Sequence, residues 1–469
     1  MSYAGEGEGE GDGAGSGAAG RTAFRVAEKR FKLVKEDTGQ RRRRRGQQRG
    51  QGSDAAAGEG GSAEGALAGA VDFRALEQRF LATGHLADTA APAATAAAGA
   101  SGGAGSATAG GDGAACVAAV AVSSIVREEG AAGLPCPVYT VQGRPGFFFL
   151  PGALTVQQQA QLIQEAVQGS VEPPNRTNHT AALGAIHGLW PAFALSCAAA
   201  SDQGSTEHGG GDDGGGGGGG GSSSRRRVSA VLRPCVGGGE AEGVQCAGKR
   251  GMGGEASEWG GENGWRGIAG EGRCVGGEAV GGGRERGVNA EWLVGKLRWA
   301  TLGVQFDWST RAYDPSLPFR PFPTFLAHLA SRLAAPAMPS AHATFSPEAA
   351  IVNFYHPGDM LGGHVDDMEA DWTKPIVSIS LGCKAVFLLG GRTRDEAPMA
   401  VVVRSGDVLL MAGPCRECFH GIPRIYSDPH EADIPAELLA PLSAGGLLPA
   451  PMRALLPTLR ININVRQVY

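Results

Sequence analysis

The chain has 469 residues, including 78 glycines and 27 prolines, and its formal net charge is −5. Glycine and proline together approach the share that is typical of low-complexity chains, so a single evenly packed domain is excluded. The slightly acidic charge gives no general attraction to nucleic acid or to an anionic membrane. No apolar run is long enough for a transmembrane helix, so no membrane partner is expected. We expect one folded unit with large interruptions.

The N-terminal part changes character at position 21. Residues 1–20 are mostly Gly, Ala and Glu and are predicted to be disordered. Residues 21–50 contain 12 Lys or Arg against three acidic residues. The five arginines at 41–45 are typical of a solvated tail, a nuclear-import signal or a nucleic-acid-binding arm. Before them, apolar residues recur at helical spacing and predict a short basic helix over about 22–36: Phe24, Ala27, Phe31 and Val34.

Composition divides the remaining chain into folded and low-complexity segments. Residues 51–130 are predicted to be mostly a low-complexity linker, and 131–199 to be the N-terminal part of the folded unit. Residues 200–289 contain an unbroken run of glycines and are predicted to be a disordered insertion, because such a chain cannot offset its ordering entropy. Residues 290–469, with a core at about 346–469, are dense in strand signals.

Short apolar and β-branched runs predict the elements of this folded unit. Strands are expected at 137–141 and 146–150, followed by a helix that starts at Thr155 with a capping box to Gln158. Further strands are expected at roughly ten-residue spacing: 376–381, 385–389, 400–403 and 408–411. This spacing predicts an all-β sandwich or barrel with flanking helices. No alternation of strands and helices supports a Rossmann-type fold.

Two histidines and one aspartate form a candidate metal site. On a strand, His364 and Asp366 would project to the same face, and His420 follows after the strand-rich stretch. Two imidazoles and one carboxylate on one face of a metal are the arrangement of non-haem Fe(II) oxygenases. Taken alone, the His-x-Asp pair is also compatible with an ordinary surface pair.

The C-terminal segment 460–466 alternates strictly between polar and apolar residues. A solvent-facing edge strand is one interpretation of this pattern. The other places Arg460 and Arg466 inside a barrel, where each guanidinium can give a carboxylate two parallel hydrogen bonds. The order His-x-Asp, His, Arg-x-Asn-x-x-x-Arg is far more specific than any one of its parts.

These motifs resemble the AlkB family of Fe(II)- and 2-oxoglutarate-dependent dioxygenases. Their detailed sequence is most similar to the AlkB homologue 1 branch of that family. The resemblance covers about half of the chain and implies a double-stranded β-helix (jelly-roll) fold. It is carried by the metal motif and by the passages at 22–25, 143–149, 174–178, 297–303, 387–391, 395–398 and 460–468.

The resemblance also implies a role for individual residues. His364, Asp366 and His420 would hold Fe(II) and so form the catalytic centre, with 2-oxoglutarate and O₂ as cosubstrates. Arg460 would pair with the far carboxylate of 2-oxoglutarate, and Arg466 would lie near its keto-acid end. Three further residues match the family's 2-oxoglutarate-contacting motifs: Asn353, Tyr355 and Asn462.

The substrate side of the site departs from the family pattern. Trp299 and Trp308 occupy the region where the family stacks a flipped base, and they are equally compatible with core aromatics. Val304 stands where an aromatic residue is expected, and Met368 replaces an acid two residues after the metal aspartate. The latter departure argues against a plain alkylation-repair role.

The expected function is oxidative demethylation of a methylated nucleobase, with N1-methyladenosine in tRNA as the first choice. N6-methyladenine in DNA, a protein substrate and a non-catalytic nucleic-acid-binding module are the alternatives. The folded segment 291–469 has 15 Lys or Arg against 17 Asp or Glu and is not a basic groove, which favours looped RNA whose bases are accessible. The arginine run favours the nucleus or cytoplasm. An organelle stays open, but no clear transit peptide points to one. No feature indicates an oligomeric state.

Cys415 and Cys418 lie just before His420 and form a lone Cys-x-x-Cys pair. Such a pair is weak evidence for zinc without a second pair. Two small buried residues on the metal loop are the alternative interpretation, and thiols at this position would also make the centre sensitive to oxidation.

Overall fold

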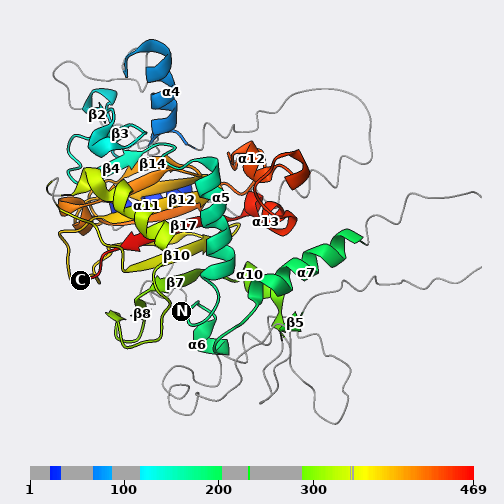
Figure 1. Ribbon diagram of the computed structural model, residues 1–469. Coiled ribbons are helices and arrows are strands. Elements are labelled where there is room, and N and C mark those ends of the chain that lie inside the picture. The colour runs from blue at the N-terminus through cyan, green and yellow to red at the C-terminus, as the bar shows by residue number, and fades with distance from the viewer. Residues whose placement is uncertain are drawn as a thin grey trace, which may run out of the picture.

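The computed structural model describes residues 22–32, 67–86, 117–202, 231–232, 288–338, 340 and 343–469. Two of its sheets, with eight and five strands, form a double-stranded β-helix flanked by helices (Figure 1). The strands are β1 (Ala70–Val71), β2 (Ile125–Glu128), β3 (Val138–Val141), β4 (Phe147–Leu150), β5 (Val231–Leu232), β6 (Val288–Asn289), β7 (Trp299–Gly303), β8 (Gln305–Asp307), β9 (Ala312–Asp314), β10 (Ala349–Tyr355), β11 (Leu361–His364), β12 (Ile376–Gly382), β13 (Ala385–Leu389), β14 (Met399–Val403), β15 (Val408–Met411), β16 (His420–Ile425) and β17 (Arg460–Arg466). The helices are α1 (Ala23–Phe31), α4 (Phe73–Thr83), α5 (Val156–Gln164), α6 (Thr180–Leu183), α7 (Leu189–Asp202), α10 (Ala290–Gly295), α11 (Thr324–Ala334), α12 (Ala436–Leu439) and α13 (Ala450–Leu455).

The eight-stranded sheet has the order β2-β3-β4-β15-β12-β17-β10-β7. Strand β17 lies between β10 and β12 and pairs with both in antiparallel register. It is therefore an interior strand, and the interpretation of 460–466 as a solvent-facing edge strand is wrong. Because β17 is covered on both faces, its polar residues lie inside the barrel and its apolar residues lie under the helices.

The apolar face of the eight-stranded sheet is covered by helices. Figure 1 shows α5 and α11 crossing this face. Apolar side chains of β12 and β17, such as Ile379 and Ile463, pack there with side chains of α5 and α11, such as Leu326. Helix α5 begins as the sequence predicts, with Thr155 and Gln158 forming a reciprocal capping box. A second core, rich in Phe and Met, lies between the two sheets.

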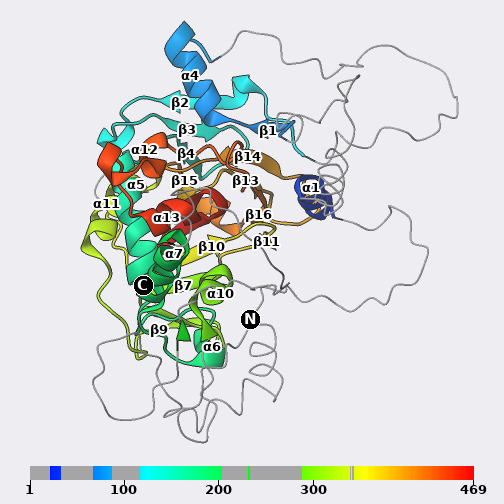
Figure 2. The same cartoon turned by 90° about the vertical axis from the view of Figure 1, so that its right-hand side faces the viewer.

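The five-stranded sheet has the order β1-β14-β13-β16-β11, so β11 lies at one edge and β1 at the other. Segments from the N-terminal part of the chain lie at both ends of this sheet. Helix α1 contacts β11, β13 and β16, as Figure 2 allows the reader to follow. At the opposite edge, β1 pairs in parallel with β14 and leads into α4.

Several boundaries differ from the sequence expectation. The predicted basic helix is confirmed over Ala23–Phe31, and its extension to 36 lies outside the described residues. Helix α4 and strands β1 and β2 fall inside the segment 51–130, whose composition predicts mostly a linker. Most of the predicted insertion at 200–289 also lies outside the described residues, although 231–232 within it pair as β5 with β6 at its end. Of the helices described, none is long and apolar enough to span a membrane.

Candidate metal centre

The three predicted metal ligands lie together at the edge of the five-stranded sheet. His364 ends β11 and His420 begins β16, and the two residues are directly paired in the antiparallel register. The ligand atoms of His364, Asp366 and His420 all lie within 4.8 Å of one another. Each histidine Nε2 is 3.7 Å from an oxygen of Asp366. Among the residues described, this is the one group of three or more His, Cys, Asp or Glu side chains with such spacing.

The way Asp366 reaches this cluster differs from the prediction. Strand β11 ends at His364, so Asp366 lies in the following loop and not on the strand. Its convergence with His364 therefore comes from the chain leaving the strand and not from the two-residue pleat. The register between β11 and β16 is also irregular between Leu361 and His364, where two glycines occur.

Both histidines are oriented by backbone carbonyls. His364 Nδ1 lies 3.0 Å from the Gly362 carbonyl, and His420 Nδ1 lies 3.2 Å from the Cys418 carbonyl. When Nδ1 carries the proton and donates, Nε2 carries the lone pair, and this is the tautomer that a metal requires at Nε2. Burial lowers the pKa of His420 to about 4, with a smaller contribution from His364. His420 is thus held in its neutral, metal-binding form.

Asp366 is held ionised by its surroundings. Burial alone would raise its pKa, but Arg466 and the two histidines together keep the pKa well below its ordinary value. Arg466 Nη2 donates to Asp366 Oδ2 at 2.7 Å. Arg466, for which the resemblance implies a place near the keto-acid end of 2-oxoglutarate, thus lies against the metal cluster and has a carboxylate partner there.

Arg466 belongs to a larger buried network that joins the two metal-bearing loops. Its Nε lies 2.7 Å from Glu369, and its Nη1 donates to the Tyr313 hydroxyl at 3.1 Å. Arg416 donates to the other oxygen of Glu369 at 2.5 Å and to the Asp366 carbonyl at 3.3 Å. Charged groups buried in pairs in this way fix the positions of the segments that carry them.

Deeper in the barrel, Arg460 lacks a charged partner. Its side chain is 1% exposed, and Nη2 donates to Ser380 Oγ at 3.1 Å. Its Nε and Nη1 have no hydrogen-bond partner, and neither has the hydroxyl of Tyr355, which is paired with Arg460 across β10 and β17. Among the ion pairs between described residues, none includes Arg460. Burial lowers the pKa of this guanidinium, which shows the cost of keeping the charge in place.

Two asparagines lie between Arg460 and the metal cluster along these strands. Asn353 and Asn462 are paired in register, with a long contact of 3.5 Å between their amides. Asn462 also donates to Ser378 Oγ at 2.9 Å and to the Ile379 carbonyl at 3.1 Å. These bonds fix the Asn462 amide on the inner face of the sheet. All five residues for which the sequence predicts a 2-oxoglutarate contact therefore lie on β10 and β17.

The unpaired groups of Arg460 and Tyr355 indicate which kind of ligand would fit beside them. A buried guanidinium without a counterion costs several kcal/mol, so an anionic ligand beside Arg460 would stabilise it. A carboxylate accepts two parallel bonds from one guanidinium, and Tyr355 offers a further donor. With the metal cluster at the other end of β17, the donors suit a molecule that has a carboxylate at one end and metal-binding oxygens at the other. 2-Oxoglutarate has this arrangement.

The two predicted substrate tryptophans lie beside the metal network. The rings of Trp299 and Trp308 are 4.9 Å apart, and Phe306 packs edge-on against Trp308 at 4.7 Å. Phe306 in turn contacts Tyr313, the partner of Arg466, at 5.2 Å. The aromatic cluster is therefore continuous with the metal network through Tyr313.

The two departures from the family pattern occur in the same place. Val304 and Met368 both pack, partly buried, against the cluster that contains Phe306 and Tyr313. The positions where the family pattern has an aromatic residue and an acid thus lie against the same small cluster. Their joint replacement makes this region more apolar than the motif of the resembled family.

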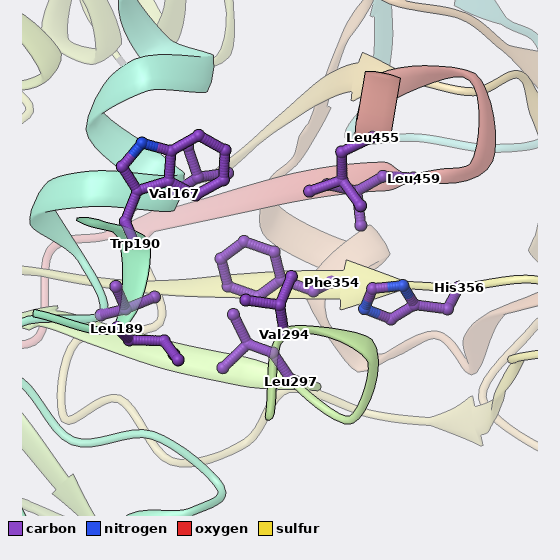
Figure 3. A pocket seen from close by; sticks show the side chains of 10 residues that line it. Val167, Leu189, Trp190, Val294, Leu297, Phe354, His356, Leu455 and Leu459 are labelled. Atoms are coloured by element: carbon purple, nitrogen blue, oxygen red, sulfur yellow. The ribbon is translucent and has the colours of Figure 1, made fainter. Parts of the chain in front are cut away.

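A small apolar cavity lies elsewhere, on the helix side of the eight-stranded sheet. Figure 3 shows Trp190, Phe354 and Leu459 around it, with His356 at its rim. Phe354 points there because it alternates with Asn353 and Tyr355, which lie on the opposite, inner face of the sheet. The cavity is therefore separated from the metal centre by the sheet. Burial lowers the pKa of His356 to about 4.

Cys415 and Cys418 are free thiols, the first buried and the second partly buried. A hydrogen bond from Cys415 lowers the pKa of the Cys418 thiol to about 7. The short helix η5 (Gly413–Glu417) that carries Cys415 also carries Arg416. The structure thus places the two cysteines on the loop that leads into His420.

Sequence reasoning missed three residues of the centre. Glu369 follows Asp366 by three residues, and an acid so close to a candidate ligand was an available signal. Arg416 and Tyr313 gave no such signal, because only the folded chain brings them to Arg466 and Glu369.

Two facing sheets, almost wholly antiparallel, with a His-Asp-His cluster and a buried arginine that lacks an ion-pair partner are the features of a 2-oxoglutarate-type Fe(II) oxygenase. Residues 276–466 match the family model of the 2OG-Fe(II) oxygenase superfamily. The Arabidopsis thaliana protein named DNA N(6)-methyladenine demethylase ALKBH1A is 39% identical over 335 residues, which are 71% of this chain and 78% of that protein. The chain therefore belongs to the AlkB family of these oxygenases.

Two further relatives match a shorter part. The human nucleic acid dioxygenase ALKBH1 is 38% identical over 38% of this chain and 47% of its own length. The tRNA demethylase abh1 of Schizosaccharomyces pombe (strain 972 / ATCC 24843) is 38% identical over 37% of this chain and 53% of its own length. This chain thus spans about half of the human and yeast proteins that it matches. Family membership makes the chain an oxidoreductase, and the family implies Fe(II), 2-oxoglutarate and O₂.

Proposed function

We propose that this chain removes methyl groups oxidatively from nucleobases, with N1-methyladenosine in tRNA as the first substrate. The observation that carries the proposal is the cluster of His364, Asp366 and His420 beside Arg466 at one end of β17, with the unpaired Arg460 at the other end of the same strand. A module that only binds nucleic acid would need neither the metal ligands nor a buried arginine without a counterion. The pairing of these two features favours catalysis.

One group of residues would hold the metal, and another would bind 2-oxoglutarate. His364, Asp366 and His420 would hold Fe(II), which supplies the activation of O₂ that oxidation of a methyl carbon requires. Arg460 and Tyr355 would bind the far carboxylate of 2-oxoglutarate. Asn353 and Asn462 would contact the cosubstrate between them. Arg466 holds Asp366 ionised and fixed in place, so that its carboxylate would be ready to bind the metal.

The product chemistry follows from the position of the oxidised carbon. Hydroxylation of an N-methyl carbon gives a hemiaminal, which collapses to formaldehyde and the unmethylated base. 2-Oxoglutarate is converted to succinate and CO₂ in the same turnover. The chain's own contribution is to bind, orient and shield the reactants from water.

The aromatic cluster is the proposed substrate side. Trp299, Trp308 and Phe306 surround the region next to Arg466 and Tyr313, and a flipped base would stack against such rings. Replacement of an acid by Met368 at this point removes a charged acceptor that could contact a base. We infer that shape and stacking contribute more than charge to the choice of base.

The relatives differ in the nucleic acid that their names state. The yeast relative is named a tRNA demethylase, and the Arabidopsis relative a DNA N(6)-methyladenine demethylase. The weakly acidic catalytic segment favours looped RNA, whose bases need no extraction from a duplex. The longer match to the Arabidopsis protein makes N6-methyladenine in DNA the second candidate.

The basic segment at 21–50 is the proposed phosphate contact, and its arginine run favours the nucleus or cytoplasm. The cations that are described lie on the outer face of α1, where Arg25, Lys29 and Lys32 are exposed while Phe24 and Phe31 are buried. Such an arm would bind phosphates without reading the sequence.

The test is a competition between the two methylated adenines. The full chain is incubated with Fe(II), 2-oxoglutarate, and equal amounts of N1-methyladenosine tRNA and a single-stranded DNA with N6-methyladenine. Nucleosides are then quantified by mass spectrometry, with His364→Ala as the control. The proposal predicts faster loss of the tRNA methyl group and no loss in the variant.

The other outcomes select among the alternatives. Faster loss of the methyl group from DNA would make N6-methyladenine in DNA the preferred substrate. Turnover of 2-oxoglutarate to succinate without loss of either methyl group would indicate another substrate, such as a protein side chain. Binding of tRNA without any turnover would support a non-catalytic module.

A further inference from the structure

The N-terminal helix α1 contacts the residue that precedes each metal histidine. Glu28 on α1 is 2% exposed, and its Oε1 accepts a hydrogen bond of 2.6 Å from the backbone N–H of Gly363, the neighbour of His364. On the same helix, the ring of Phe24 lies 6.3 Å from that of Phe419, the neighbour of His420. The two contacts join segments more than 300 residues apart in the chain.

Gly363 lies where the sheet itself gives least support. Strand β11 is the edge of the five-stranded sheet, and its pairing with β16 is irregular between Leu361 and His364. An edge strand has an unpaired row of backbone groups, and glycine restricts the backbone least of all residues. Without an added contact, this stretch would be the most mobile part of the metal site.

Side chains replace the missing backbone partners of Gly363. Glu28 accepts from its N–H, and Arg394 Nη2 donates to its carbonyl at 2.8 Å. The Arg394 carbonyl in turn accepts from the N–H of Phe24 at 2.9 Å, and the Arg394 guanidinium lies 4.8 Å from the centre of the Phe419 ring. Together these contacts link α1 to the segments that precede His364 and His420.

The two glycines in this region make room for the helix. A Cβ on Gly363 would lie 2.4 Å from the Phe24 ring, and a Cβ on Gly390 would lie 2.8 Å from its other edge. Real Cβ atoms do not approach so closely, so both positions must be glycine while Phe24 is docked. The second oxygen of Glu28 pairs with Arg25 at 2.8 Å, which orients its carboxylate.

We propose that Glu28 is a positioning residue for the metal centre, acting through Gly363 on His364. The Gly362 carbonyl orients the His364 ring and belongs to the peptide bond whose N–H Glu28 holds, so loss of this hydrogen bond frees the carbonyl as well. The inference rests on the proposed metal site, because it assigns to Glu28 the geometry of a ligand in that site.

The test measures metal affinity in the absence of turnover. The full-length, metal-free chain is titrated with Mn(II), and free Mn(II) is followed by electron paramagnetic resonance. Loss of an orienting contact behind a metal histidine weakens binding by roughly 10-fold or more, and we expect this for Glu28→Ala. In Glu28→Gln the amide oxygen still accepts from Gly363, so its Kd should stay within about threefold of the parent.

The control is a partly buried ion pair near the opposite edge of the same sheet. Arg74 on α4 pairs with the buried Asp407 at 2.7 Å, far along the strand order from β11. Arg74→Ala should lower Tm and leave the Mn(II) Kd unchanged. The inference is overturned if Glu28→Ala binds Mn(II) as the parent does, or if Glu28→Gln is as weak as Glu28→Ala. A parent chain that binds no Mn(II) would overturn the proposed function itself.

Discussion

At the residue scale, the pocket is built around an arginine whose charge is left without a counterion. Arg460 lies on the interior strand β17, has no ion-pair partner among the described residues and has two nitrogens without a hydrogen bond, whereas Arg466 on the same strand contacts Asp366, Glu369 and Tyr313. One guanidinium thus serves the metal carboxylate and the other is kept available for a ligand. The difference has a consequence for stability in the absence of a ligand.

Replacing Arg460 with methionine should separate stability from binding. A side chain of similar volume without a buried charge should leave the metal-free chain as stable as the parent, or more stable by up to about 3 kcal/mol in the free energy of unfolding. The affinity for 2-oxoglutarate should fall at least about 100-fold, because two charge-assisted hydrogen bonds are lost. Urea unfolding and isothermal titration would measure the two effects.

The matched control for this variant is Arg453→Met on α13, which lies outside the barrel and has one long hydrogen bond to the Leu439 carbonyl. It should bind 2-oxoglutarate as the parent does. Unchanged 2-oxoglutarate affinity in Arg460→Met would show that another residue receives the far carboxylate.

At the element scale, the turn after β7 positions the hairpin that carries the aromatic cluster. Gly303 has a φ of +68°, and a Cβ there would lie 2.1 Å from the Glu348 carbonyl oxygen. The same oxygen accepts the N–H of Val304 at 3.0 Å, so the close approach is part of the turn. The turn therefore depends on glycine for both conformation and space.

Gly303→Ala should destabilise the chain by at least about 2 kcal/mol, since both the positive φ and the collision oppose it. Gly295→Ala at the end of α10 is the control, because nothing lies within 4 Å of its Cβ position; its effect should stay within about 1 kcal/mol. Chemical denaturation of the two variants gives the comparison. Equal stability would mean that the turn adapts to a side chain.

A buried histidine links two helices on the other side of the sheet. His179, just before α6, contacts the carbonyl of Leu293 on α10 through Nε2 at 2.9 Å. Burial lowers the pKa of His179 to about 4, whereas an unfolded histidine titrates near 6.5. The unfolded chain therefore binds the proton first as the pH falls.

Stability should consequently decrease as the pH falls from about 6.5 toward 4, by up to about 3 kcal/mol for this one group. His179→Gln retains a donor for Leu293 but does not titrate, so its stability should depend less on pH over this window. Urea unfolding of parent and variant at several pH values measures the difference. Parallel curves would show that His179 is not the titrating group.

At the scale of the whole molecule, the sequence predicted the barrel well and its N-terminal attachments poorly. The β-branched runs at 376–381 and 408–411 became β12 and β15 because they are buried on both faces. The alternation at 460–466 predicted which residues face the pocket. These signals are local, so they can be read without the fold.

The missed features depend on contacts between distant segments. Nothing around Glu28 indicates that it reaches Gly363, and nothing near Arg416 indicates Glu369. Helix α4 was hidden in an Ala- and Gly-rich surrounding, although Arg74 ties it to Asp407 in the core. Asp366 was placed on a strand because a pleat and a loop can bring the same pair of side chains together.

The central claim is that one site couples the conversion of 2-oxoglutarate to removal of a methyl group. The direct measurement is the amount of succinate and formaldehyde formed with tRNA containing N1-methyladenosine, in the parent and in Asp366→Ala. We predict formaldehyde in proportion to demethylated base in the parent, and neither product in the variant. Formaldehyde release that is equal in the two proteins, or its absence from both, would contradict the claim.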